Sequence, residues 1–463
     1  MDALAGHAFA RVASAQFSSG NAVRLLRDGP ENYPAWLGAI AAAERNVHLE
    51  NYIIEDDAVG RSFADALIDA TGRGVRCLVL YDWLGCRGRA PARFWSRLRR
   101  NGVDVRSYNP ARPAKPLGWL SRDHRKILCV DGTVGFTGGL CIGHEWKGDP
   151  EHGIAPWRDT AVEIRGPAVR DLDMAFADSW ASTGPPIPND DAPRPDSDEH
   201  AGEHDVLVIA GKPESMGLYR LQQLLAEIVE ESLWLTDAYF VASTGYVRAL
   251  TGAARNGVDV RLLVPGSSDI PVIQELSRAG YRALLEAGVR IFEWNGPMLH
   301  AKTAVADGRL ARIGSSNSNL ASWIANRELD VTTTDPRLAA EMAAMFENDL
   351  GNATEIMLRS RRVTPSSPEG ERPARGTRKA QASRLVAGAV GIGSSANAAI
   401  ARHRHLDSSE SRVLAVAGAI AMAFAAAALL MPDLIAYPAA AMAIWVGATL
   451  LARAWRLRRS DEP

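Results

Sequence analysis

The sequence predicts an α/β protein made of two related halves, each an α/β sandwich with a mixed sheet, arranged about a pseudo-twofold axis. Apolar runs of strand length alternate with runs of helical periodicity, which favours layered α/β architecture over an all-α or all-β fold. The same order of runs occurs twice along the 463 residues. Two copies of one unit indicate a body with a site shared at its axis.

The repeat is visible in the order of the individual elements. In the first half, NVHLENYIIE is expected to form a strand, SFADALIDATGRG a helix, and VRCLVLYD a buried strand. In the second half, SLWLTDAYFV, YVRALTGAARNG and VDVRLLVPG follow in the same order. Each half then continues through a helix into a Gly-Val strand, NGVDVRSYNP or AGVRIFEWNG. These matches predict equivalent folds for the two halves.

Shifts in composition set the expected boundaries. The stretch 182–204 is rich in Pro, Asp and Gly and is predicted to link a first half at 15–181 to a second half at 205–358. A basic, flexible linker is expected at 359–382. A small-residue helix and an apolar helical hairpin are expected to follow at 383–459.

The apolar hairpin consists of two uncharged segments, 413–431 and 434–452, each long enough for a bilayer crossing of about 20 residues. Basic residues flank both outer ends: Arg402, Arg404, Arg412, Arg453, Arg456, Arg458 and Arg459. This distribution predicts a membrane-inserted anchor in the cell inner membrane, with the main body of the chain on the cytoplasmic side. The alternative is an Ala-rich helix pair buried at the end of a soluble domain.

The overall composition argues weakly against nucleic acid as a partner. The chain has 52 Lys and Arg against 54 Asp and Glu, so no net positive field is present. The cysteines show no C-x-x-C pairing and no zinc-like spacing, which predicts reduced, mostly buried thiols. They are Cys77, Cys86, Cys129 and Cys141.

One motif, His-x-Lys followed after four residues by Asp, occurs once in each half: His124, Lys126 and Asp131, then His300, Lys302 and Asp307. Residues two apart on a strand share a face, so each His is expected beside its Lys. Each Asp-Gly pair favours a hairpin turn, which returns a small-residue stretch (138–141 or 314–317) to the same place. A Lys beside each His disfavours a divalent metal site.

This set of groups suits a phosphodiester. Two ammonium groups, with the hydroxyl of Ser315 and the amide of Asn317, are expected to bind phosphate oxygens. One imidazole attacks phosphorus while the other protonates the leaving alkoxide, and these opposite protonation states predict a bell-shaped pH profile. Asp159 and Glu328 lie downstream of the two motifs and are expected to orient the imidazoles.

The two H-x-K-x4-D copies, with HLENYIIEDDAVG, GFTGGL, DAYFV and the G-S-x-N continuation, resemble the phospholipase D superfamily over about residues 20–355. The layout is most similar to bacterial cardiolipin synthases. The resemblance implies a phosphohistidine intermediate, no metal and no cofactor, and transfer of a phosphatidyl group from one phosphatidylglycerol to another lipid alcohol. It also implies the membrane and phospholipids as partners, and it leaves the oligomeric state open.

By position in that family, His124 is the usual nucleophile and His300 the general acid, although the symmetry of the site leaves this assignment open. Lys126, Lys302 and Asn317 would hold the phosphate, and the motif aspartates would sit in turns. Cys141 departs from the family, which often has Asn there.

Three other functions remain open at this point. A hydrolytic phospholipase D uses the same groups with water as the acceptor. A nuclease of the superfamily would need a basic groove and no membrane segment. A membrane-tethered binding module would retain only a relic site. The basic, aromatic loop at 111–122 fits a lipid headgroup surface or an ordinary long loop equally well.

Overall fold

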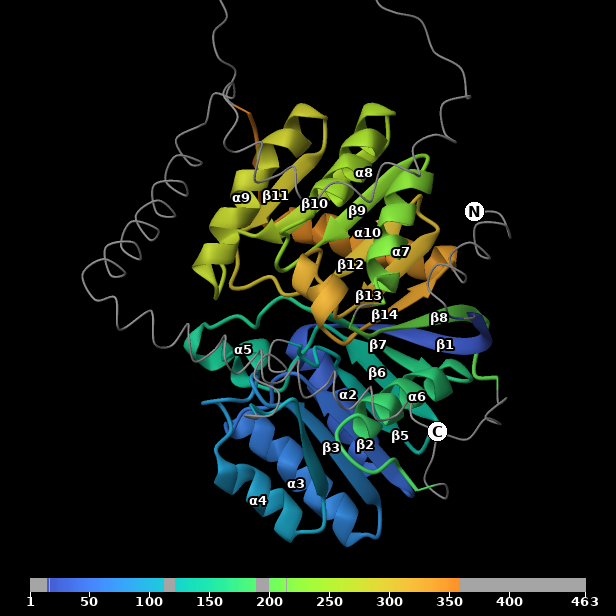
Figure 1. Cartoon of the computed structure of the whole chain (residues 1–463), viewed down its shortest axis with the longest axis vertical. Coiled ribbons are helices and arrows are strands. Elements are labelled where there is room, and N and C mark those ends of the chain that lie inside the picture. Colours follow the sequence, from blue (N-terminus) through green and yellow to red (C-terminus); the bar gives the residue numbers. More distant parts are fainter. Residues whose placement is uncertain (1–14, 16, 112–120, 189–199, 214, 359–463) are drawn as a thin grey trace, which may run out of the picture. The chain divides into compact units, whose positions relative to one another are not determined.

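The computed structural model describes residues 15, 17–111, 121–188, 200–213 and 215–358 (Figure 1). Contacts divide the chain into Met1–Ala399 and Ile400–Pro463, and every described residue belongs to the first unit. Most of the 111–122 loop, the middle of the 182–204 linker, the 359–382 linker and the 383–459 hairpin lie outside the described residues. Within the described part of the chain, no helix combines the length and apolarity that a bilayer crossing requires.

A single mixed sheet of fifteen strands runs through the described residues. The first half contributes β1 (Phe17–Arg27), β2 (Asn46–Asn51), β3 (Arg76–Asp82), β4 (Asp104–Tyr108), β5 (Ile127–Val130), β6 (Val134–Gly138) and β7 (Thr160–Arg165). The second half contributes β8 (His204–Gly211), β9 (Ser232–Thr236), β10 (Asp259–Pro265), β11 (Arg290–Trp294), β12 (Thr303–Ala306), β13 (Leu310–Gly314), β14 (Glu328–Thr333) and β15 (Ala353–Ile356).

The strand order shows the repeat. At the centre β1 pairs antiparallel with β8. Outward from β1 lie β7, β6, β5, β2, β3 and β4, and outward from β8 lie β14, β13, β12, β9, β10 and β11, with β15 added at that edge. In each half the outer three strands of the repeat are parallel and the rest antiparallel. The predicted mixed α/β fold is therefore confirmed, and the β1–β8 pair joins the halves into one sheet.

Helices cover both faces of this sheet. They are α2 (Asp28–Ala41), α3 (Ala58–Gly72), α4 (Ala92–Arg100), α5 (His144–Lys147), η2 (Pro150–His152), α6 (Ala168–Ala181), α7 (Gly217–Ile228), α8 (Thr244–Arg255), α9 (Pro271–Glu286), η4 (Ala321–Ala325) and α10 (Pro336–Leu350). On β3, Val79 packs in a core with α3 and α4, whereas Leu78 and Leu80 pack in another core with α6. Alternate residues of a strand point to opposite faces, so α6 lies across the sheet from α3 and α4.

One core cluster joins the halves. It contains Leu172 and Phe176 of α6, Leu338 and Met342 of α10, and Ile313 of β13, all buried. Burial of apolar surface contributes about 25 cal/mol per Å², so side chains of this size give the joined sheet substantial stabilisation. The ends of β5, β7, β12 and β14 are thereby held in fixed relative positions.

Both motif hairpins form. β5 pairs with β6, and β12 pairs with β13, each antiparallel. Asp131 and Gly132 have φ of +54° and +67°, and Asp307 and Gly308 have φ of +49° and +60°. Asp tolerates this left-handed region better than most residues and Gly adopts it freely, which is why the sequence Asp-Gly recurs at both turns.

Candidate active site

The two motif histidines line one cavity of about 520 Å³. His124 lies three residues before β5 begins at Ile127, and His300 lies three residues before β12 begins at Thr303. Both residues are buried, at 7% and 4% exposure, so only a small part of each ring meets solvent. Each half therefore delivers one imidazole to a shared cavity.

Each imidazole is oriented by a carboxylate from the opposite half. Nδ1 of His124 donates to Oε2 of Glu328 at 2.9 Å, and Nδ1 of His300 donates to Oδ2 of Asp159 at 2.8 Å. Both carboxylates are buried. A bond of this kind fixes the ring orientation and leaves Nε2 as the unprotonated nitrogen. Nε2 is then the atom available for nucleophilic or acid–base chemistry.

Backbone hydrogen bonds explain why the carboxylates cross between halves. The His124 amide donates to the Arg327 carbonyl at 2.9 Å, one residue before Glu328. The His300 amide donates to the Arg158 carbonyl at 2.7 Å, one residue before Asp159. Each histidine is thus tied by its main chain to the segment whose next residue binds its ring.

The motif lysines are fully buried, and neither is among the residues that line the cavity. Lys126 Nζ donates to the His124 carbonyl at 2.6 Å, and Lys302 Nζ donates to the His300 carbonyl. The ammonium of Lys126 also lies 5.2 Å from the ring centroid of Tyr52. Two buried cations beside one cavity favour an anionic ligand, because little water is present to screen their charge.

The imidazoles are neutral at physiological pH. Burial, together with the charge of Lys302, lowers the pKa of His300 to about 3 against the opposing effect of Asp159. Burial also lowers the pKa of His124, although Glu328 offsets part of this effect. Burial alone would raise the pKa of each carboxyl group, but the neighbouring histidine and lysine side chains bring both below the ordinary value. Neutral rings therefore face ionised carboxylates.

Burial also lowers the pKa of Lys302, to about 8. The charge of Lys126 adds to the decrease, whereas Asp159 and Asp237 oppose it. The positive charge on this side of the cavity is consequently sensitive to mildly alkaline pH.

Two predicted phosphate ligands lie in different surroundings. Asn317 lines the cavity, and its buried Oδ1 has no hydrogen-bond partner among the described residues. Ser315 does not line the cavity: its hydroxyl donates to Oε2 of Glu328 at 2.6 Å and accepts from the Leu329 amide at 2.9 Å. Ser315 therefore supports the carboxylate that orients His124, and Asn317 is the residue placed to meet a ligand.

The motif aspartates lie at the opposite ends of their strands from the histidines. The side chain of Asp131 accepts from the amides of Glu44, Arg45 and Asn46, at 2.8 to 2.9 Å. Asp307 does the same for the three amides of residues 230–232. Neither aspartate lines the cavity. Both fasten a hairpin turn to the beginning of the neighbouring strand.

Four aromatic residues of the site were missed from the sequence. Tyr52 contacts the ring of His124 edge-on at a centroid distance of 4.9 Å, and Tyr239 contacts the ring of His300 at 5.9 Å. Trp146 and Trp157 also contact His300. The tyrosines occupy matching positions in NYIIE and DAYFV, so alignment of the two repeats carried a signal for them. Both tryptophans belong to the first half, so alignment of the two repeats gave no signal for them.

Trp146 has a second role that mirrors that of Ser315. Its Nε1 donates to Oδ2 of Asp159 at 3.0 Å. The carboxylate of Asp159 therefore receives bonds from Trp146 and His300, as the carboxylate of Glu328 receives bonds from Ser315 and His124. The two halves support equivalent carboxylates with different side chains.

An arginine also reaches the cavity. Arg122 is buried, and its guanidinium donates to Oδ1 of Asp82 at 3.2 Å. Burial raises the pKa of Asp82 to about 6 in spite of this arginine. The Nε of Arg122 has no hydrogen-bond partner among the described residues. The first-half wall thus carries a buried cation with an unused donor.

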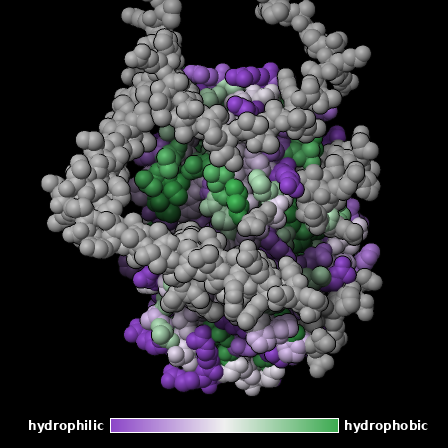
Figure 2. Space-filling model, viewed as in Figure 1, coloured by the Kyte–Doolittle hydropathy of each residue, from purple (hydrophilic) through white to green (hydrophobic). Residues whose placement is uncertain are grey.

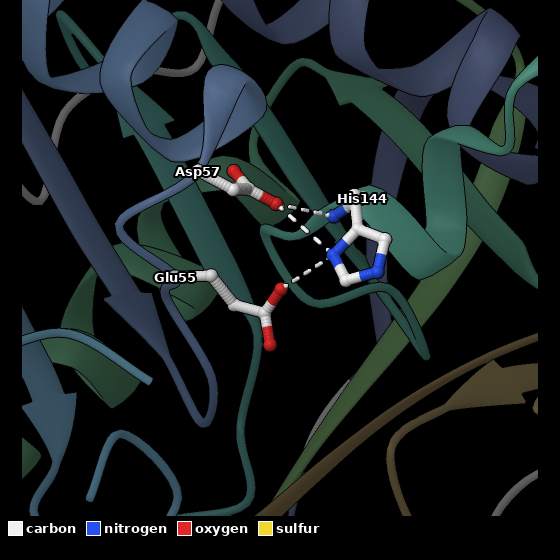
Figure 3. Close-up of side chains that lie close together, drawn as sticks. All are labelled: Glu55, Asp57 and His144. Carbon is white, nitrogen blue, oxygen red and sulfur yellow. Dashed lines mark hydrogen bonds and ion pairs between the residues drawn. The ribbon is translucent and has the colours of Figure 1, made fainter. Parts of the chain in front are cut away.

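A polar cluster lies near Arg89, which lines the cavity. Nδ1 of His144 is 3.0 Å from Oε2 of Glu55 and 3.4 Å from Oδ2 of Asp57 (Figure 3). The other oxygen of Glu55 binds Arg89, and the other oxygen of Asp57 caps α3 through the Gly60 amide at 2.7 Å. Each carboxylate already has a protein partner, and Glu55 links the cluster to Arg89.

The sequence matches a family model described as "Cardiolipin synthase, PLD-like domain" at residues 37–145 and 224–350, one segment in each half. Each segment contains one complete His-Lys-Asp motif. The chain belongs to this cardiolipin synthase family.

Curated relatives of the family cover most of the chain. A cardiolipin synthase from Alkalihalophilus pseudofirmus is 33% identical over 341 residues, which are 72% of this chain and 67% of the relative. Cardiolipin synthase A from Pseudomonas aeruginosa is 33% identical over 350 residues, covering 74% of this chain and 69% of the relative. Similarity at this level extends across both halves of the described fold.

Among solved structures, phosphatidylserine synthase from Haemophilus influenzae has a TM-score of 0.60 at 14% identity, covering 76% of this chain and 91% of that one. Polyphosphate kinase from Porphyromonas gingivalis has a TM-score of 0.50 at 16% identity, covering 72% of this chain and 48% of that one. At identities this low, the TM-scores show a shared fold and nothing more specific.

Proposed function

We propose that this protein is a phosphatidyltransferase of the cardiolipin synthase type, which moves a phosphatidyl group from phosphatidylglycerol to another lipid alcohol. The observation that carries the proposal is the pair of neutral imidazoles on one cavity, each held by a carboxylate of the opposite half. Two buried lysines donate to the main-chain carbonyls of the same histidines. Family membership and the identity to curated cardiolipin synthases support the same activity.

In the first step, Nε2 of one histidine attacks phosphorus of the bound phosphodiester. A P–N bond forms, the P–O bond to glycerol breaks, and glycerol oxygen takes a proton from the other imidazole. The lysine ammonium groups and the Asn317 amide stabilise the charge on the non-bridging oxygens. His124 remains the proposed nucleophile by family position, and His300 the proposed acid.

In the second step, the hydroxyl of the acceptor lipid attacks the phosphohistidine. The imidazole that gave up its proton now takes the acceptor proton, the P–N bond breaks, and both rings return to their starting state. Since the same base serves water or an alcohol, exclusion of water from the cavity decides between transfer and hydrolysis.

Protonation of the acid requires the substrate. Burial and the adjacent lysines keep both imidazoles neutral in the free protein. A phosphodiester anion beside the rings favours the charged form of imidazole, so binding raises the pKa of the ring that donates the proton. The active protonation state is therefore assembled with the bound substrate.

We also propose that the reaction needs no metal, because Lys126 and Lys302 supply the positive charge that a cation would otherwise bring. Anchoring in the cell inner membrane by the 413–452 hairpin, with the body on the cytoplasmic side, is proposed from the sequence. Protease protection of the full chain in sealed inverted vesicles tests the orientation.

The decisive experiment incubates the purified full chain with labelled phosphatidylglycerol, with and without chelator, and identifies products by mass. Cardiolipin with release of glycerol supports the transferase. Phosphatidic acid as the sole product establishes the hydrolase instead, and no lipid turnover combined with cleavage of DNA establishes the nuclease. Loss of cardiolipin on chelation contradicts metal independence.

A further inference from the structure

Exposed apolar side chains gather beside the cavity. Within the part of the chain that the structure describes, nine large hydrophobic residues are exposed, and five of them belong to two segments of the second half. We call these five the apolar rim: Ile270, Val272, Leu276, Leu320 and Ile324. Figure 2 shows hydrophobic surface in the region where α9 and the segment around η4 lie in Figure 1. This clustering distinguishes the rim from isolated exposed residues, which are common.

The rim is continuous with the cavity wall. Ile270 lines the cavity itself, as does Ile273 in the first turn of α9. Ala321 and Ser322 of η4 line it from the other rim segment. Val272 and Leu276 are four residues apart on α9, so they share one face of the helix. The apolar surface therefore extends from the cavity onto the protein exterior.

The cavity wall from the first half contributes three arginines, Arg87, Arg89 and Arg122. Arg89 is ion-paired with Glu55 and Glu145, and Arg122 with Asp82, whereas Arg87 lies over the ring of Trp83. The acidic groups nearest the rim in sequence are engaged: Asp269 accepts from the Tyr239 hydroxyl at 2.7 Å, and Glu275 lies 3.9 Å from Arg278. An apolar margin on a cavity that also carries arginines complements a ligand with acyl chains and phosphate groups.

We propose that the apolar rim docks onto the surface of an anionic phospholipid bilayer. The phosphodiester of a membrane lipid then passes the arginines to reach the histidines, while its acyl chains remain among the rim side chains and the neighbouring lipid. This inference rests on the proposed phospholipid substrate and identifies the surface through which that substrate enters. It is separate from the hairpin anchor, since it concerns only residues 270–276 and 320–324.

A fluorescent label tests insertion directly in the full chain. The cysteines at 77, 86, 129 and 141 are all buried, so a new exposed cysteine is labelled selectively. Val272→Cys carries an environment-sensitive dye, and Met174→Cys on α6 is the matched control because Met174 is 55% exposed and does not line the cavity. Vesicles of phosphatidylglycerol and phosphatidylcholine are added to each labelled protein.

On phosphatidylglycerol vesicles, we expect a blue shift and a several-fold increase in emission at position 272 and no change at 174. No change at 272 would overturn the docking surface. A blue-shifted emission at 272 before vesicles are added would also overturn it, because the rim would then be covered by another segment of the chain or by a second copy.

Kinetics provide an independent readout. Val272→Asp combined with Leu276→Asp removes two apolar anchors, and turnover of phosphatidylglycerol in vesicles is expected to fall roughly tenfold. Turnover of a short-chain, monomeric phosphatidylglycerol should fall much less, since that substrate reaches the cavity without a bilayer. Equal losses on both substrates would contradict the proposal, and Met174→Asp controls for added charge.

The two proposals fail separately. Label insertion without cardiolipin synthesis would leave the docking surface standing and overturn the proposed reaction. Cardiolipin synthesis without insertion at position 272 would overturn the docking surface and leave the proposed reaction standing.

Discussion

His124 and Glu328 are 204 residues apart in the chain, yet Nδ1 of the histidine lies 2.9 Å from Oε2 of the glutamate. The reciprocal pair, His300 and Asp159, spans 141 residues in the opposite direction. Each half therefore supplies the ring of one pair and the carboxylate of the other. Neither half alone orients its own motif histidine, so the site is complete only when the β1–β8 pair joins the two halves.

Replacing Glu328 with Gln should lower kcat about 10- to 100-fold, because the amide no longer stabilises the charged imidazole and can favour the wrong ring tautomer. Steady-state assays on phosphatidylglycerol measure the effect. Glu163→Gln is the matched control, since Glu163 is also buried but binds Arg24 and Arg165. An unchanged kcat in Glu328→Gln would remove the orienting role.

Alanine at either His124 or His300 should reduce turnover at least about 1,000-fold, because each step needs both a nucleophile and an acid–base group. A substrate with a nitrophenol leaving group separates the roles. The variant without the acid should still release nitrophenol and accumulate phosphohistidine, detectable by mass, and the variant without the nucleophile should do neither. Substantial activity of either variant on phosphatidylglycerol would defeat the two-histidine scheme.

Asp307→Ala should destabilise the fold by about 1–2 kcal/mol, because three backbone amides at the beginning of β9 lose their carboxylate acceptor. Chemical denaturation measures the loss. At a temperature where the variant remains folded, kcat should stay near that of the parent. Glu347→Ala, at an exposed position on α10, is the control and should change stability by less than about 0.5 kcal/mol. A large fall in kcat with unchanged stability would instead indicate a catalytic role for Asp307.

The pKa of Lys302, about 8, predicts alkaline loss of substrate capture. Above this pH the free protein loses an ammonium charge, so kcat/KM should fall. The value of kcat reports the substrate-bound state and should fall only at higher pH. Lys302→Arg should remove this fall, because guanidinium stays charged. Stability responds to pH in the opposite direction. Between pH 8 and 10.5 the unfolded chain still binds a proton at Lys302 that the folded chain has released. The contribution of Lys302 to the free energy of unfolding therefore rises with pH over this range. An unchanged alkaline limb in Lys302→Arg would contradict the assignment.

Cys141 stands in the first half where the second half has Asn317. Burial raises the pKa of its thiol, and the adjacent Lys126 and Lys302 only partly oppose this, so the thiol stays protonated and is a weak hydrogen-bond donor. Cys141→Asn should leave turnover unchanged or raise it, as measured with phosphatidylglycerol. Complete loss of activity in a correctly folded variant would reveal a function for the thiol.

Much of this protein follows from local pattern. Alternating apolar runs predicted the α/β elements, and helices α3 and α8 formed within a few residues of their expected ranges. The Asp-Gly pairs predicted the hairpins because few other residues tolerate left-handed backbone at consecutive positions. The duplicated His-x-Lys motif identified the two histidines of the site. The expected shared strand face is not what places them: each pair lies just before its strand, with the histidine on the cavity and the lysine buried outside its lining.

Contacts between distant segments were decided only by the tertiary structure. The sequence placed Asp159 and Glu328 at similar distances after their motifs, yet each binds the histidine of the other half. It contained no sign that Ser315 would face Glu328 instead of the cavity, or that Ile270 and Leu320 would border the same opening. Spacing along the chain specifies periodicity and turns. The pairing of β1 with β8 and the shared core around α6 and α10 determine which remote residues meet.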